Sequence, residues 1–283
     1  MADAKKSIAV RVPASSANIG PGFDVLGIAL SLHIEAGLGN APAESNDADE
    51  NHPLTIAFRH DGGTGQLWVR SQMPMGKGLG FSGAARIAGC VLAHAQKHGV
   101  GSTEFDQAKQ SILRRASELE GHPDNAGASL FGGVVASVEG LAVRVPTPLD
   151  PAIIVWVPQQ KTSTKESRTK LPQTVPFADA VFNVGHTALL VAAIAAGDIN
   201  ALSVATRDRL HQDSRLANAP DSKVALKAAL DAGAWCGWLS GSGPTIAAMT
   251  SQKDAQRIDE ALPRSGSKMV LRIAQQGAEL FEI

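Results

Sequence analysis

The sequence predicts an α+β fold with two domains, and three observations support this. Short β-branched runs and longer segments with helical spacing are mixed along the chain, without the regular alternation of a parallel α/β sheet. The chain has 283 residues, 44% of them hydrophobic and 19% charged, which suffices for two compact cores. Pro146, Pro148 and Pro151 interrupt the chain near its middle, so we place the boundary between domains 1–150 and 151–283.

The elements of the first domain follow from local patterns. Strands are expected where β-branched and apolar residues cluster, over residues 7–12, 67–69 and 132–138. Helices are expected where small and aliphatic residues recur at helical spacing, over residues 82–98 and 105–119. The segment 40–53 is polar and acidic with no fixed spacing of metal ligands, so it is predicted to be a solvated loop.

The second domain begins with an apolar run at 153–157, which is predicted to be a buried strand. A polar loop and two or three helices are expected next. The segment 237–249 is predicted to be a turn and a strand, and 268–274 a late strand. We find no internal repeat, so a repeat architecture is excluded.

Charge and cysteine content narrow the class of protein. The formal net charge of −1 provides no basic field for nucleic acid or an acidic membrane. Cys90 and Cys236 are far apart, so buried reduced thiols are expected rather than a disulfide or a zinc site. Residues 1–6 lack the apolar stretch of a signal peptide, and the longest apolar run, 188–196, is too short to span a bilayer. These features predict a cytoplasmic enzyme.

A glycine-rich segment at 75–85 (Met-Gly-Lys-Gly-Leu-Gly-Phe-Ser-Gly-Ala-Ala) joins a predicted strand to a predicted helix. Its glycines let the backbone curl around a ligand, and the N–H groups at a helix start favour an anion such as phosphate. It is not a Walker A loop, since the Gly-x4-Gly-Lys-Ser/Thr pattern is absent. Gly78-x-Gly80-x-x-Gly83 matches a dinucleotide fingerprint but lacks the regular βαβ unit. On this motif alone, phosphate binding and an ordinary glycine turn are equally open.

Two polar motifs flank the glycine-rich segment in the sequence. Residues 13–24 follow the first strand and contain Asn18 and Asp24, which taken singly are better explained as a turn residue and a helix or turn cap. Residues 118–125 contain Glu120, a suitable Mg²⁺ ligand beside phosphates, and His122, which alone would more often be structural.

A second glycine turn lies at 239–245 (Leu-Ser-Gly-Ser-Gly-Pro-Thr) after an apolar stretch. The two glycine turns either fold against each other or are unrelated loops.

Together, in this order, the four motifs resemble those of the GHMP kinase family. Gly-Leu-Gly-Phe-Ser-Gly-Ala-Ala looks like its phosphate loop, and Ser-Gly-Ser-Gly-Pro-Thr looks like its C-terminal glycine motif, which packs against that loop. The resemblance covers nearly the whole chain. It implies an N-terminal domain like domain 2 of ribosomal protein S5 and a C-terminal ferredoxin-like α/β sandwich. It also implies ATP and Mg²⁺ as cofactors, and a homodimer as a family expectation.

Three features resemble the homoserine kinase branch of that family: the runs Asn-Ile-Gly-Pro-Gly-Phe-Asp and Glu-Gly-His-Pro-Asp-Asn, and the segments 163–168 and 208–215. The resemblance implies phosphorylation of L-homoserine by ATP in threonine biosynthesis. Six residues would surround homoserine: Asn18, Asp24, His122, Thr164, Arg168 and Arg215. The chemistry agrees, because the ammonium of a zwitterion needs an acceptor such as Asp24 and its carboxylate suits a guanidinium. Taken singly, each arginine would more often be a solvated surface charge.

The same resemblance implies the remaining site residues. The nucleotide would contact Pro74, Met75, Gly76, Lys77, Gly78, Leu79, Gly80, Phe81, Ser82, Gly83 and Ala84. Mg²⁺ would be held by Ser82 and Glu120. The catalytic groups would be Asn18, Glu120, Asn125 and Arg168.

Four positions in these motifs depart from the family pattern or have a second interpretation. Phe81 departs from the family, which usually has a serine there, so that hydroxyl is lost or its role passes to Ser82. Asn125 stands where some relatives have an aspartate base, and since an amide cannot take a proton, the reaction would proceed by in-line approach and transition-state stabilisation. Lys77 would add positive charge, although an exposed lysine is the more usual interpretation. Asp124 is explained equally well as a structural residue.

Two other functions compete with this one. Another GHMP kinase, acting on shikimate, pantoate or a mevalonate-pathway compound, would also use Arg168 and Arg215 for a carboxylate, but only an amino substrate would pair with Asp24. A non-catalytic ligand-binding protein of the same fold is the second, and it is kept open by Phe81.

Overall fold

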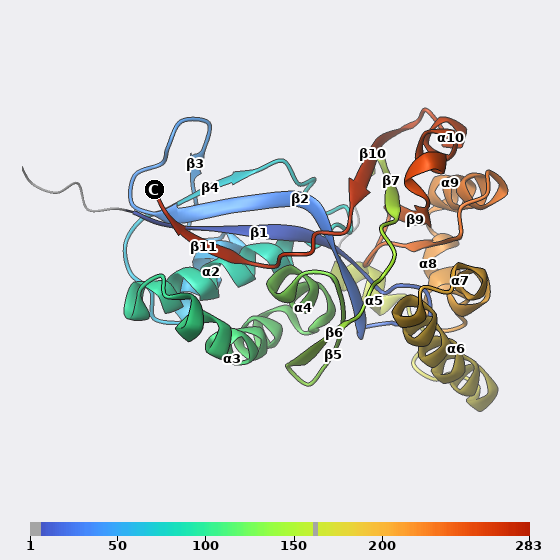
Figure 1. The fold of residues 1–283 in the computed structure, drawn as a ribbon, viewed down its shortest axis with the longest axis horizontal. Helices are drawn as coiled ribbons and strands as arrows, with labels where there is room; N and C mark the ends of the chain where they lie inside the picture. The colour runs from blue at the N-terminus through green and yellow to red at the C-terminus, as the bar shows by residue number, and fades with distance from the viewer. Residues whose placement is uncertain (1–6, 161–163) are drawn as a thin grey trace, which may run out of the picture.

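The computed structural model describes residues 7–160 and 164–283, without the side chains of residues 164–166, and contains two antiparallel sheets (Figure 1). The first sheet contains β1 (Ile8–Ala17), β2 (Leu26–Leu38), β3 (Asn46–Asp47), β4 (Leu67–Ser71), β5 (Val134–Val138), β6 (Leu141–Val145) and β11 (Glu279–Glu282). The second contains β7 (Ala152–Pro158), β8 (Cys236–Leu239), β9 (Ile246–Thr250) and β10 (Gly266–Arg272). The helices that precede β7 are α1 (Pro53–His60), α2 (Phe81–His98), α3 (Ser102–Glu120) and α4 (Asp124–Phe131). Those that follow it are α5 (Thr164–Thr169), α6 (Phe177–Ala196), α7 (Ile199–Ala205), α8 (Gln212–Leu216), α9 (Pro220–Asp231) and α10 (Ala255–Ala261), with a 3₁₀ turn η1 (Gln252–Asp254).

The long strand β2 is the centre of the first sheet. It pairs with β1 along most of its length, with β4 near Ile34–Leu38 and with β5 near Leu26–Ile28. Helices α2 and α4 pack against β1 and β2, and α3 packs on the outside of α2 (Figure 1). This arrangement places the N-terminus of α2 and the segment between α3 and α4 beside the end of β1.

The second sheet has the order β10-β7-β9-β8 and is covered by α9 and α10. Its own core is formed by residues such as Trp156, Leu226, Ile246 and Ile258. The two sheets meet where the N–H of Gly241, after β8, donates to the carbonyl of Ala17 at the end of β1 over 2.9 Å. The turn after β8 therefore lies against the end of β1.

The last strand, β11, leaves the second sheet and pairs antiparallel with β1. Strands β1–β6 and β7–β10 lie in different sheets on either side of residue 150, but β11 belongs to the first sheet. The division into domains 1–150 and 151–283 stays a prediction, which this returning strand complicates.

Each predicted strand and helix exists in the structure, with ends that differ by a few residues, but several elements were missed, among them α1, β2, α4, β6 and β11. In β2, the glycines weakened the local strand pattern. They are required there because a Cβ on Gly27 would lie 2.3 Å from the carbonyl oxygen of Asp124, and one on Gly37 would meet the Trp68 ring. The loop expected at 40–53 contains the two-residue β3 and ends at Pro53, the first residue of α1. Proline is favoured at that position.

The helix count after β7 was also underestimated, since two or three helices were expected where the described residues form α5 to α9, and α10 follows β9. One described helix, α6, is long and apolar enough to cross a membrane by length and composition. Only 22% of its apolar window is buried within the described structure. Here α6 packs against α7, and its Asn183 side chain donates to Asp208 over 2.7 Å.

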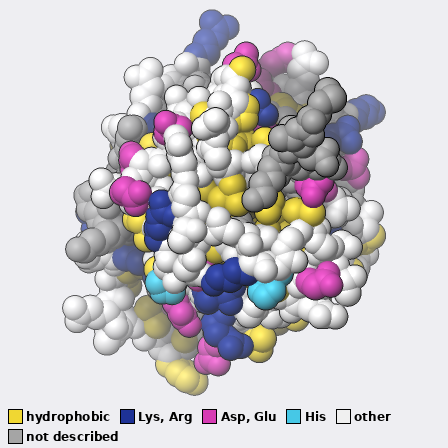
Figure 2. Space-filling view, turned by 90° about the vertical axis from the view of Figure 1, so that its left-hand side faces the viewer, with side chains coloured by type: hydrophobic (Ala, Val, Ile, Leu, Met, Phe, Trp, Pro, Cys, Tyr) yellow, Lys and Arg dark blue, Asp and Glu magenta, His cyan; other side chains and the backbone are white. Residues whose placement is uncertain are grey.

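One expectation from composition is confirmed. Cys90 and Cys236 are buried free thiols, and burial raises the pKa of both, that of Cys236 to about 12. On the face shown in Figure 2, acidic and basic side chains are intermingled with apolar atoms, in agreement with a net charge near zero.

Candidate active site

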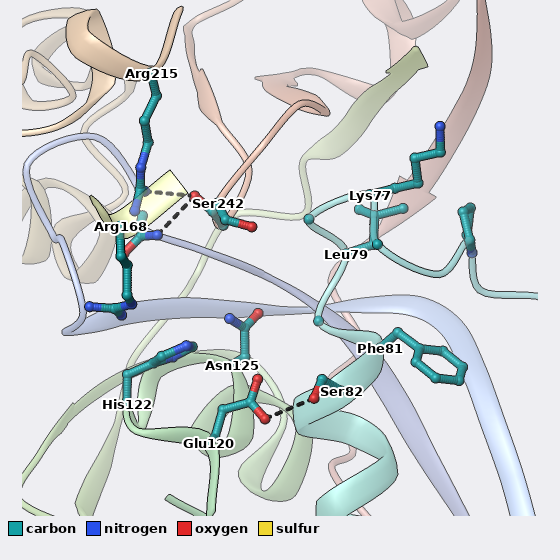
Figure 3. Close-up of a pocket in the computed structure, with 16 residues that line it drawn as sticks. Lys77, Leu79, Phe81, Ser82, Glu120, His122, Asn125, Arg168, Arg215 and Ser242 are labelled. Atoms are coloured by element: carbon teal, nitrogen blue, oxygen red, sulfur yellow. Dashed lines mark hydrogen bonds between the residues drawn. The ribbon is translucent and has the colours of Figure 1, made fainter. Parts of the chain in front are cut away.

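A cavity opens where the first sheet's helices meet the turn after β8 (Figure 3). Among the described residues it is lined by Asn18, Pro74, Gly76, Lys77, Gly78, Leu79, Gly80, Phe81, Ser82, Glu120, His122, Asn125, Arg168, Arg215, Gly241 and Ser242. Most of the predicted site residues are therefore gathered around one space. Met75 is exposed, and Gly83 and Ala84 lie behind the lining. The predicted Thr164 side chain and Ser163 lie outside the described residues.

The two glycine turns do fold against each other. The hydroxyl of Ser240 donates to the carbonyl of Gly78 over 2.6 Å, and it also meets the Ser16 hydroxyl at 2.7 Å. A Cβ on Gly78 would lie 2.3 Å from the carbonyl oxygen of Ser240. Only glycine permits this approach, which fixes the loop before α2 against the second sheet.

Helix α2 begins at this loop, and its N-cap Gly80 and first residues, Phe81 and Ser82, line the cavity. Its N-cap, Gly80, has left-handed backbone angles and provides no side-chain hydrogen bond. The first N–H groups of a helix lack a partner within the helix, and the helix dipole adds positive potential there. The geometry therefore suits an anion such as a phosphate.

Phe81 does not block this turn. Its ring is directed away from Ser82 and Glu120 (Figure 3) and meets the His52 ring edge-on, with 5.7 Å between centroids. The ring is partly buried against the main core. The departure from the family pattern thus removes a hydroxyl without filling the space beside it.

Ser82 and Glu120 lie together at one end of the cavity, with the serine hydroxyl donating to Glu120 Oε2 over 2.9 Å (Figure 3). Arg86, one turn further along α2, contacts both of these oxygen atoms with its Nη1. The Arg86 and Glu120 side chains are only 18% and 11% exposed. Arg86 was not predicted, because its four-residue spacing from Ser82 indicates a role only once Glu120 is known to contact both side chains.

Lys77 is not the exposed lysine that the sequence favoured. It is buried, and its ammonium donates to the carbonyl of Pro158 over 2.7 Å and to those of Gln159 and Gln160. The side chain points away from Ser82 and Glu120 (Figure 3). Lys77 therefore ties the glycine-rich loop to the end of β7.

The other end of the cavity is strongly charged. Arg168 donates to both carboxylate oxygens of Asp24, over 2.6 and 2.9 Å. Asp24 lies just behind the cavity lining and is joined to it by this pair. Asp24 and Arg168 were expected to bind the opposite ends of a zwitterion. In the protein as described, they instead neutralise each other.

Arg215 is 6% exposed and donates to the carbonyl of Gly241 over 3.1 Å. Burial, and then the nearby positive charge of Arg168, lower the pKa of Arg215 to about 10. The Phe23 ring lies within 5.5 Å of both guanidinium groups and makes a cation–π contact with each. Phe23 was not predicted, since a ring beside Asp24 in sequence gives no sign that two distant arginines meet it.

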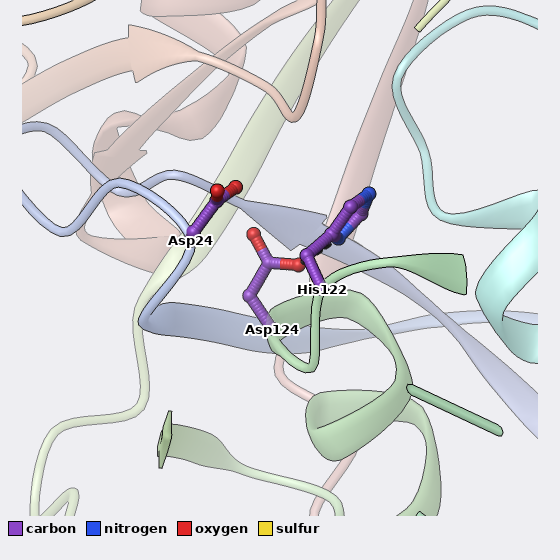
Figure 4. Close-up of side chains that lie close together, drawn as sticks. All are labelled: Asp24, His122 and Asp124. Carbon is purple, nitrogen blue, oxygen red and sulfur yellow. Dashed lines mark hydrogen bonds and ion pairs between the residues drawn. The ribbon is translucent and has the colours of Figure 1, made fainter. Parts of the chain in front are cut away.

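His122 and Asp124 form a buried pair in which the imidazole Nδ1 donates to Asp124 Oδ1 over 2.6 Å. This leaves His122 Nε2 as an acceptor when the ring is neutral. Asp124 Oδ2 is buried without a hydrogen-bond partner among the described residues. Ligand atoms of Asp24, His122 and Asp124 lie within 4.8 Å of one another (Figure 4). This set has metal-ligating chemistry, and it is equally suited to an ammonium group.

Asn18 and Asn125 are held by the surrounding backbone and hydroxyls. Asn18 donates to the carbonyl of Gly241 over 2.9 Å and accepts from the N–H of Asp24 over 2.8 Å. The Ser15 hydroxyl donates to Asn125 Oδ1 over 2.9 Å. Both amides are therefore positioned rigidly at the cavity wall.

The stability of the folded protein should vary with pH because of His211, a buried histidine behind Arg215. Its Nε2 donates to the carbonyl of Gly20 over 2.8 Å, and burial lowers its pKa. In the unfolded chain the imidazole becomes protonated near pH 6.5, whereas in the folded chain it stays neutral to a lower pH. The free energy of unfolding should therefore fall as the pH drops from 7 to 5. The loss is about 1.4 kcal/mol for each unit by which the folded-state pKa lies below the unfolded-state pKa. Urea unfolding at several pH values would show this. The variant His211→Gln, which keeps a donor, should have a shallower slope, and an unchanged slope would contradict the assignment.

Comparison with known proteins identifies two family models in the chain. The model of the GHMP kinase N-terminal domain matches residues 53–133, and that of the GHMP kinase C-terminal region matches residues 190–268. The homoserine kinase of Desulfitobacterium hafniense is 37% identical over 276 residues, covering 90% of this chain and 91% of that protein. A homoserine kinase of Thermus thermophilus is 34% identical, covering 93% and 95%.

Solved structures give the same relationship. The crystal structure of homoserine kinase from Cytophaga hutchinsonii superposes with a TM-score of 0.83 at 27% identity, covering 99% of both chains. The mevalonate kinase of L. major, solved with R-mevalonate, has a TM-score of 0.66 at 13% identity over 96% of both chains, which indicates a shared fold.

Proposed function

Because the chain belongs to the GHMP kinase family, we propose that it transfers the γ-phosphoryl group of ATP to the side-chain hydroxyl of L-homoserine, a step of threonine biosynthesis. The curated relatives that share about a third of its residues over nearly its full length are homoserine kinases. The two-domain GHMP kinase fold and its kinase activity follow from the same matches.

One observation carries the substrate assignment: the cavity joins an anion-binding helix start to a cluster of both acidic and basic side chains. ATP phosphates would lie at the N-terminus of α2. At the other end, Arg168 and Arg215 would take a carboxylate, while Asp24 and the unpaired oxygen of Asp124 would take an ammonium. A zwitterionic amino acid satisfies all of these groups at once.

Homoserine must open the Asp24–Arg168 pair to bind in this way. Its ammonium would replace the guanidinium beside Asp24, and its carboxylate would replace Asp24 beside Arg168. The exchange replaces one ion pair by two, and the two new pairs offset the cost of removing the charged ends of the amino acid from water. Phe23, whose ring contacts both guanidinium groups, would keep Arg168 oriented during the exchange.

Mg²⁺ would be held by Ser82 and Glu120, which fit it because the two oxygen atoms lie 2.9 Å apart beside the phosphate position. When bound, the ion supplies charge neutralisation for the phosphates. The protein's own part is positioning: the α2 amides orient the phosphates and Asn125 faces the acceptor. Since the amide of Asn125 cannot remove a proton, in-line approach and electrostatic stabilisation carry the reaction.

An ADP-release assay with different acceptors tests the assignment. We expect turnover with homoserine at least about 100-fold above that with shikimate, mevalonate or pantoate, because those acceptors leave buried acidic groups unpaired. Faster turnover of a non-amino acid would identify another GHMP kinase. No turnover with any acceptor would favour a ligand-binding protein of the same fold.

The variant Asp24→Asn should raise the KM for homoserine by about tenfold or more and leave the KM for ATP unchanged, since it removes a charge partner of the ammonium. Steady-state kinetics with each substrate varied would measure this. Asp179→Asn is the matched control, because Asp179 forms an ion pair with Arg209 at 3.2 Å outside the cavity. Equal effects of the two variants would contradict the role of Asp24.

A further inference from the structure

Arg86 occupies the position where the proposed function needs a metal ion. Its Nη1 contacts the Ser82 hydroxyl and Glu120 Oε2, the two oxygen atoms assigned to Mg²⁺. The donor set therefore fits the ion, but a cation of the protein itself already neutralises it.

This arginine is not an ordinary surface charge. Both members of the Arg86–Glu120 pair are largely buried, so removing either one would leave the other uncompensated in a poorly hydrated place. Arg86 Nε, moreover, is buried without a hydrogen-bond partner among the described residues. Burial also lowers the pKa of Arg86, although an arginine remains protonated.

Its location on α2 adds a further cost. Helical side chains point toward the N-terminus of their helix, which brings the Arg86 guanidinium back to the positively polarised start of α2. A cation there is unfavourable unless an anion compensates it. In the protein as described, Glu120 is that anion.

We propose that Arg86 is a built-in competitor of the divalent cation: it neutralises Glu120 while no metal is bound and must leave that carboxylate when the metal–nucleotide complex binds. The inference rests on the proposed function only for the identity of the metal site. With Arg86 in place, metal-free ATP meets no net negative charge from Glu120, and a metal ion must displace a guanidinium to reach the carboxylate.

Mn²⁺ titration of the nucleotide-free protein, followed by the electron paramagnetic resonance signal of the free ion, tests this directly. Arg86→Met should bind Mn²⁺ about tenfold or more tightly than the unmodified protein, since it removes a close charge competitor. The double variant Arg86→Met/Glu120→Gln should lose that gain. Arg115→Met is the matched control, because Arg115 pairs with Asp61 at 2.6 Å outside the cavity.

The affinity for metal-free ATP should change in the opposite direction to the affinity for Mn²⁺. Calorimetric titration with ATP in EDTA should show about tenfold weaker binding to Arg86→Met, because the unpaired Glu120 then repels the tetra-anion. If Arg86→Met does not fold, Arg86→Lys replaces it and should show smaller changes with the same signs. Equal Mn²⁺ affinities of variant and unmodified protein would overturn the proposal, and so would a double variant that retains the gain. Neither readout involves the acceptor, so a failed homoserine assay would leave the result interpretable.

Discussion

Gly80→Ala is expected to lower the rate of phosphoryl transfer by at least about 100-fold, because a misplaced reacting group costs about that much. Gly80 has φ +68°, and a Cβ there would lie 2.0 Å from the Ser15 hydroxyl and 2.9 Å from Asn125 Oδ1. The first turn of α2, or the Ser15 and Asn125 side chains, must therefore shift. The shift separates the phosphate-binding amides from the wall that faces the acceptor. Single-turnover kinetics with saturating ATP and homoserine would measure the effect on the transfer step.

Gly197→Ala is the matched control for backbone strain. Gly197 ends α6 with φ +70° and ψ 25°, close to the +68° and 19° of Gly80, and lies outside the cavity. The nearest atom to its added Cβ would be Cγ of Pro148, at 3.1 Å. Both variants should lose about 1 to 2 kcal/mol of stability from the left-handed backbone, but only Gly80→Ala should lose catalysis. Similar rates for the two would refute the requirement for this close approach.

Arg215→Met should raise the KM for homoserine by about 100-fold while leaving the stability of the protein unchanged or higher. The two effects separate because Arg215 is kept buried beside Arg168 at an energetic cost, which is the reason its pKa falls to about 10. Methionine fills similar space without that cost, but it cannot bind a carboxylate. Losing one partner of a buried charge pair typically costs about 2 to 5 kcal/mol of binding.

Kinetics with homoserine and ATP varied separately, together with urea unfolding, would test this expectation. Arg209→Met serves as the control, since Arg209 is exposed, lies over the Phe182 ring at 4.0 Å and is not part of the cavity. The assignment fails if Arg215→Met raises the KM for ATP instead. It also fails if the variant destabilises the protein without changing substrate affinity.

Local patterns predicted the elements that carry strong periodicity, such as α2 and α3, and missed those that depend on their neighbours. Helix α4 has only eight residues and includes Gly127, so its helical propensity is low. It forms because seven of its residues, Asp124–Leu130, are buried against the first sheet and α2. Strand β2 was missed for a related reason: its glycines are explained only by Trp68 and the Asp124 carbonyl, which lie elsewhere in the sequence.

The site was foreseen as a set of residues but not as a set of interactions. The sequence by itself determined which groups are available: a glycine-rich turn before a helix, a second such turn, and separate acids, amides and arginines whose order resembles one family. Only the tertiary structure decided their partners. In the fold, Asp24 pairs with Arg168, and Lys77 donates to the end of β7. The Phe81 ring packs against His52, and Arg86 pairs with Glu120. The physical reason is that charge pairing and close backbone approach act through distances in space, and residues such as Asp24 and Arg168, 144 positions apart, acquire such a distance only when the chain folds.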